Sequence, residues 1–266
     1  LGDKMKLHPI NILFLLCSLS FSQIQHGGVP KHVINEYDIK IHEVDYSKEK
    51  VNDLHPMVLR YAYEYLVDID IISESTKLIG ADETTYYLGI HSEGAKALGF
   101  VFDEFILTEN SKMFIYSKDR SMHIGSFNSK NNNYSNTLAT SVVKGETVFI
   151  ELTVPNDEVK DLRLHLNIVT HDFLDLMNLH LEENSDRVDC NDNVACSSAN
   201  AWLDQVDSVV LVSSNGGVCS AAIVNNTAFD LTPYILYAAH CNGGSNVVYF
   251  NYQSNSCSGN NSGNYN

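Results

Sequence analysis

An alternation of apolar and polar residues with a period of two runs through the middle of this 266-residue chain and constrains its fold most strongly. A strand with this pattern buries one of its two faces. Polar turn segments at 108–111 and 128–136 separate the alternating stretches between residue 84 and about 169. The pattern predicts an antiparallel β-sandwich-like region. The clearest buried positions are Val148, Ile150 and Leu152 in one strand and Leu162, Leu164, Leu166 and Ile168 in another.

Before the alternating region, apolar pairs recur near helical spacing. The pairs are Met57-Val58, Tyr61-Ala62 and Tyr65-Leu66. This spacing predicts a short helix over residues 56–66.

A second apolar run, Tyr234 to Ala238, ends on the tetrapeptide Ala-Ala-His-Cys at 238–241. The run is typical of a buried strand, and the Asn-Gly-Gly that follows Cys241 is a turn signal. His240 should therefore lie where the strand becomes a loop, either as a catalytic base or as a histidine that only hydrogen-bonds there. Cys241 can tether this loop if a partner lies on a neighbouring strand, and Cys219 is the obvious candidate. Such a bridge closes roughly 22 residues and stabilises by about 3 kcal/mol.

The amino terminus has the shape of a secretory signal. Met5-Lys6 precedes an apolar run from Ile10 to Phe21 that is too short to span a bilayer, and Ser20 and Ser22 suit cleavage before Gln23. A lipoprotein anchor on Cys17 is less favoured because Leu16 is not small. We expect residues 5–22 to be a signal peptide and the mature chain to be secreted, either periplasmic or extracellular, with no membrane association.

The cysteines after Cys17 all lie in the last third of the chain. In an exported protein such clustering indicates a disulfide framework. A zinc site of Cys219, His240 and Cys241 lacks a C-x-x-C pair, and the spacings of His165, His171 and His180 fit no usual ligand pattern. We therefore expect neither a metal nor another cofactor. The five cysteines are Cys190, Cys196, Cys219, Cys241 and Cys257.

Composition divides the chain near residue 189. An acidic linker at 182–187 is followed by a segment from Cys190 that has no lysine or arginine. Its four aspartates give it −4 of the net charge of −16, which leaves −12 for the residues before it. The absence of basic residues can be chance, or it can protect this segment from cleavage after lysine or arginine. The net negative charge argues against nucleic acid or an anionic membrane as a partner.

The segment from Cys190 to Cys257 resembles the lysyl endopeptidase branch of the chymotrypsin-fold serine peptidases. One departure is Tyr237, where the family's motif usually has threonine. The sequence of this segment predicts strands at 206–212, 218–224, 234–238 and 247–252. The resemblance implies that they form an incomplete first β-barrel of a double barrel. The residues that carry it, in order, are Cys190 to Cys196, Ser208 to Val212, Cys219, Val224 to Ala228 with Asp230, Ala238 to Cys241, and Val247 to Gln253 before Cys257.

The resemblance also implies roles for particular residues. His240 is the catalytic base, and the disulfides are Cys219–Cys241 and Cys196–Cys257, whereas Cys190 has no partner in this chain. Residues 23–189 take the place of a propeptide that packs on the peptidase domain, 190–266, and Arg187 offers a cleavage point.

The family's catalytic order is His, Asp, Ser. No aspartate follows His240, and Ser258 and Ser262 lack a Gly-Asp-Ser-Gly setting. We therefore expect a fragment of an exported serine endopeptidase, inactive by itself, whose substrates are proteins or peptides, possibly cut after lysine. The alternative is a non-enzymatic exported β-protein whose sandwich region binds a partner and whose peptidase-like segment is a remnant.

Overall fold

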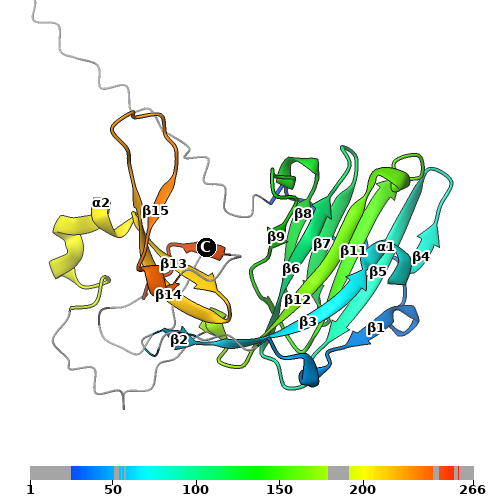
Figure 1. Cartoon of the computed structure of the whole chain (residues 1–266), viewed down its shortest axis with the longest axis horizontal. Coiled ribbons are helices and arrows are strands. Elements are labelled where there is room, and N and C mark those ends of the chain that lie inside the picture. Colours follow the sequence, from blue (N-terminus) through cyan, green and yellow to red (C-terminus); the bar gives the residue numbers. More distant parts are fainter. Residues whose placement is uncertain are drawn as a thin grey trace, which may run out of the picture.

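The computed structural model describes residues 25–50, 54, 56, 58–178, 192–241, 246–254 and 257. These residues form a mainly β protein with three sheets, so the expected fold class is confirmed (Figure 1). Two sheets pack face to face, and the third lies beside them. The expected signal peptide at 5–22, the linker at 182–187 and Cys190 lie outside the described residues.

The first sheet is six-stranded. All its strand pairs are antiparallel except that of β1 with β5, which is parallel and departs from the expected antiparallel pattern. The strands run in the order β1 (Lys40–Glu43), β5 (Glu83–His91), β11 (Thr147–Pro155), β7 (Lys112–Ser117) and β8 (His123–Phe127), and β4 (Thr76–Ile79) also pairs with β5.

The second sheet is five-stranded and packs on the first. Their facing sides enclose the main core, which contains Val148, Ile150 and Leu152 from one sheet and Leu164 and Leu166 from the other, as the alternation predicts. The order is β10 (Val143–Lys144), β6 (Ala97–Ile106), β12 (Arg163–Asp172) and β3 (Ala62–Asp70), and β9 (Leu138–Ala139) also pairs with β6.

The prediction of a single buried face is wrong for β11. Phe149 and Glu151 point away from the main core but are 1% exposed, because residues 25–39 cover this outer side of the sheet. Phe149 packs with Ile39 in a small aromatic cluster. The Glu151 carboxylate accepts hydrogen bonds from the backbone N–H groups of Lys31 at 2.6 Å and His32 at 3.0 Å.

The third sheet belongs mostly to the last part of the chain. Its order is β15 (Tyr234–Leu236), β14 (Gly217–Val224), β13 (Val209–Ser214) and β16 (Asn246–Phe250), and β2 (Leu59–Arg60) also pairs with β14. The sheet is open among the described residues and forms no closed barrel. All four strands expected in this region are present, with ends shifted by up to three residues.

The prediction of a helix over residues 56–66 is wrong. Residues 59–60 form β2, and β3 begins at Ala62. β3 pairs along its length with β12, while β2 pairs with β14, so long-range strand pairing overrides a weak local periodicity here.

The helices among the described residues are all short. Within the part of the chain that the structure describes, no helix has the length and apolar character needed to cross a membrane. They are η1 (Glu36–Asp38), η2 (Tyr46–Lys48), α1 (Ile71–Glu74), η3 (Ser129–Asn131), η4 (Val159–Asp161), η5 (Leu176–Asn178), η6 (Ser197–Trp202), α2 (Leu203–Val206) and η7 (Ala239–Cys241), where η marks a 3-10 helix.

Candidate functional site

His240 lies in the 3-10 turn η7, just after strand β15. The strand ends at Leu236, two residues earlier than expected, and the turn is closed by a hydrogen bond from Cys241 N–H to Ala238 O at 2.9 Å. His240 is exposed while Cys241 is buried. The turn therefore anchors itself through the cysteine and presents the imidazole at the surface.

A disulfide fastens this turn to the third sheet. Cys241 is bonded to Cys219, and their Cα atoms are 6.2 Å apart. Cys219 lies inside β14 and is paired with Val212 of β13, so the anchor is an interior strand. This is the pair that the resemblance implies, and it keeps the backbone of His240 next to β14.

The unusual Tyr237 fits into the same region. Its half-buried ring packs against the small cluster of Val210, Val212 and Ala221. Its hydroxyl accepts a hydrogen bond from Asn246 Nδ2 at 3.4 Å. Tyr237 therefore links the start of β16 to the segment that leads into His240.

The second implied disulfide, Cys196–Cys257, is also present. It joins residues separated by 61 positions, with Cα atoms 4.4 Å apart. Cys196 directly precedes η6, and Cys257 follows the third sheet. Two disulfides within 62 residues fit an oxidising compartment.

Three possible metal ligands meet at the His240 turn. Cys219, His240 and Cys241 each place one possible ligand atom within 4.8 Å of the other two. Among the residues that the structure describes, this is the one such group. The two sulfur atoms are bonded to each other, however, and a metal needs thiolates. This group does not fit a zinc ion while the disulfide is intact.

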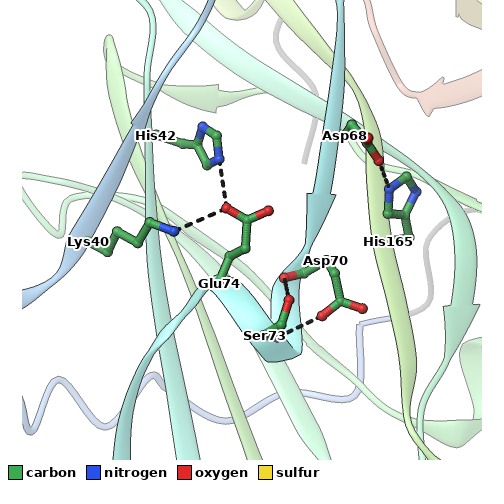
Figure 2. A network of polar contacts seen from close by, with 7 residues as sticks. All are labelled: Lys40, His42, Asp68, Asp70, Ser73, Glu74 and His165. Atoms are coloured by element: carbon green, nitrogen blue, oxygen red, sulfur yellow. Dashed lines mark hydrogen bonds and ion pairs between the residues drawn. The ribbon is translucent and has the colours of Figure 1, made fainter.

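His165 and His171 have surroundings that differ from those of His240. His165 lies between two carboxylates, with Nδ1 at 2.6 Å from Asp103 and Nε2 at 2.9 Å from Asp68, and Figure 2 shows the Asp68 contact. Burial lowers the pKa of His165, but the hydrogen bonds and charges of the two aspartates outweigh it and raise the pKa above the ordinary value. His171 Nδ1 is 2.7 Å from Ser92 Oγ. His180 lies outside the described residues.

Figure 2 also shows a neighbouring polar network on the sandwich. The Glu74 carboxylate accepts from Lys40 Nζ at 3.1 Å and contacts His42 Nε2 at the same distance. The Asp70 carboxylate accepts the Ser73 N–H at 2.7 Å and thereby caps α1. These contacts tie β1, α1 and β3 together.

The sequence does not predict which residues join the sandwich to the third sheet. Strand β2, from the amino-terminal part, pairs with Gly217 and Val218 at the start of β14. The one sequence signal for this place is Asn215-Gly216, which is typical of a two-residue β-hairpin turn. It predicts the hairpin of β13 and β14 but says nothing of what the hairpin contacts.

An exposed histidine on a turn that a disulfide fastens to a neighbouring strand can take up a proton and return it. Residues 184–266 match the family model described as lysyl endopeptidase, C-terminal domain. This last part of the chain is therefore similar to the C-terminal domain of lysyl endopeptidases. No solved structure matches the chain.

Proposed function

We propose that the chain is part of an exported serine endopeptidase in which His240 is the general base. The observation that carries the proposal is the position of His240, exposed on a turn that a disulfide fastens to β14, inside the segment that matches the lysyl endopeptidase model. Preference for lysine is proposed from the family alone. The substrates are proteins or peptides.

In this mechanism the imidazole moves one proton twice. A serine hydroxyl attacks the carbonyl carbon of the scissile bond while His240 takes the hydroxyl proton, and His240 then gives that proton to the leaving amine. Water subsequently hydrolyses the acyl-serine by the same route. An aspartate that accepts a hydrogen bond from the imidazole keeps the ring in the correct tautomer.

The serine and the aspartate of this mechanism are not assigned to any of the 266 residues. No aspartate follows His240 in the sequence. We therefore expect these residues alone to show no turnover, and we expect activity only from a polypeptide that supplies both partners.

Residues 23–189 are proposed to act as a propeptide ahead of the peptidase segment 190–266. Their packing against this segment supports the proposal, since β2 pairs with β14 and a shared apolar cluster lies between them. Arg187 is the proposed processing point, because from Cys190 onward the sequence has neither lysine nor arginine.

The test is hydrolysis of lysyl and arginyl ester substrates by two proteins. The first is the 266-residue chain, and the second is the product of the gene's complete reading frame. The proposal expects no turnover by the first and lysyl ester turnover by the second, with processing near residue 187. A reading frame that ends at residue 266, or a complete product without esterase activity, would favour the non-enzymatic remnant.

A further inference from the structure

The hairpin of β13 and β14 meets the amino-terminal sandwich at its tip. All of β13 pairs with one edge of β14, at residues 217–222. On the other edge of β14, residues 222–224 pair with β15. At the start of that other edge, Gly217 and Val218 pair with β2. The sandwich thus adds a strand to the sheet that carries His240, as peptides do when they extend an open sheet edge.

The turn of the hairpin fits closely against the sandwich backbone. Gly216 O accepts hydrogen bonds from the N–H groups of Tyr61 at 2.9 Å and Ala62 at 3.1 Å. Gly216 has φ +75°, and a Cβ atom at this position would lie 2.3 Å from Ala62 O. The docking surface therefore excludes any side chain at residue 216.

Side chains on both parts close the contact. The hydroxyls of Tyr61 and Ser213 hydrogen-bond at 2.7 Å in a buried position, and Tyr252 Oη donates to Leu176 O at 2.8 Å. The Lys50 ammonium donates to Glu64 of the sandwich at 3.0 Å and to Asn215 of the hairpin at 3.2 Å.

An apolar cluster lies beneath these polar contacts. It contains side chains from residues before 178 and from residues after 192. From the sandwich side come Tyr61, Ala62, Ala97, Val142 and Leu176, and from the peptidase side come Val218, Val247 and Tyr249.

These contacts combine strand pairing, an exclusive fit at Gly216 and a shared core. We infer that residues 25–178 are a non-covalent partner of the β13–β14 hairpin, so that cutting the chain within 179–191 does not by itself release the peptidase segment. The inference rests on the proposed function only in calling that segment a peptidase. Processing would then have to be followed by a separate step that breaks this contact.

The experiment uses the whole 266-residue chain with a recognition site for a sequence-specific protease placed at 182–187. After a native cut, size-exclusion chromatography should show both halves in one peak at the elution volume of the uncut chain. Two separate peaks for the unsubstituted protein would overturn the inference. This outcome is independent of esterase activity, so it can fail while His240 remains the base.

A matched pair of glycine substitutions tests the docking surface itself. Gly216 and Gly94 both have positive φ, at +75° and +77°, but a Cβ at Gly94 has no atom within 4 Å. Backbone strain in Gly216→Ala acts on the free and docked hairpin alike, whereas the clash with Ala62 acts only when docked. Gly216→Ala should separate the cut halves at concentrations where Gly94→Ala leaves them together. Equal retention in both variants would contradict the assigned surface.

A milder pair checks the buried hydrogen bond. Tyr61→Phe removes the contact with Ser213 and should raise the dissociation constant of the cut halves about fivefold. Tyr63→Phe, two residues further along the chain in β3 and exposed, should leave it unchanged. A Tyr61→Phe constant equal to that of Tyr63→Phe would show that this bond does not contribute to docking. Circular dichroism of each variant before cutting verifies that it is folded.

Discussion

The two disulfides should stabilise the protein by different amounts that follow from their loop lengths. The perturbation is the double substitution Cys219→Ala with Cys241→Ala, compared with Cys196→Ala with Cys257→Ala. The bridged residues are 22 positions apart in the first pair and 61 in the second. In the chain-entropy model, loops of these lengths contribute about 3 and about 4 kcal/mol respectively.

The assay is urea unfolding under non-reducing conditions, followed by two probes. Fluorescence of Trp202, the one tryptophan in the sequence, reports the peptidase segment, and far-UV circular dichroism reports all three sheets. Because the sandwich and the peptidase segment share an apolar cluster, both probes should give one transition in the unsubstituted protein.

Loop length determines both the size and the order of the expected losses of stability. Removal of either bridge should lower the free energy of unfolding by several kcal/mol, and the longer loop should lose more. A loss below about 1 kcal/mol for both pairs would refute the assigned bridges as sources of stability. A larger loss for Cys219–Cys241 than for Cys196–Cys257 would refute loop length as the deciding factor.

Three further outcomes follow from the sandwich. Glu151→Gln should lower the free energy of unfolding by about 2 kcal/mol, because the buried carboxylate accepts hydrogen bonds from two backbone N–H groups. Glu83→Gln, at an exposed ion pair, should lower it by less than about 1 kcal/mol, and equal losses in urea unfolding would contradict the prediction. The pKa of His165 is raised in the folded protein, so its pairing with Asp103 and Asp68 contributes stability fully below about pH 6.5 and loses it as pH rises through the folded pKa. The difference in unfolding free energy between the unsubstituted protein and His165→Gln should therefore shrink from pH 5.5 to pH 9. A constant difference would count against the assignment. Burial raises the pKa of Asp172 to about 6, so this group contributes stability below about pH 4 that is lost as pH rises toward 6. Asp172→Asn should remove this contribution to the pH dependence of the unfolding free energy, and an unchanged pH dependence would contradict the prediction.

Local patterns were enough to predict the elements that bury a face by themselves. The alternation through Val148 and Leu166 marks real strands whose apolar sides meet in the core. In these places sequence spacing and tertiary contacts agree.

The failures all involve partners far away in the sequence. Residues 56–66 show a helical spacing, but β2 and β3 form there because β14 and β12 supply hydrogen-bonding edges. Glu151 looks like a solvent-facing residue until residues 31 and 32 cover it. Strand periodicity describes one element at a time and cannot identify which distant segment covers its second face.

The candidate site shows the same division. The short motif around His240 was sufficient to select a candidate base, and the resemblance supplied the disulfide pairs that the structure contains. The docking of the hairpin tip on the sandwich had no local signal, because a backbone carbonyl and the space beside a glycine leave no pattern in the residues around them.

The most direct test of the role of His240 is the kcat/KM of the enzyme made from the complete reading frame, measured on a lysyl ester. His240→Ala should reduce it by about 10⁴-fold or more, because no other group can then take the serine proton. The matched control is His123→Ala, which replaces an exposed histidine on β8 of the sandwich and should leave kcat/KM unchanged. Activity of His240→Ala within tenfold of the unsubstituted enzyme would contradict the assignment of His240 as the base.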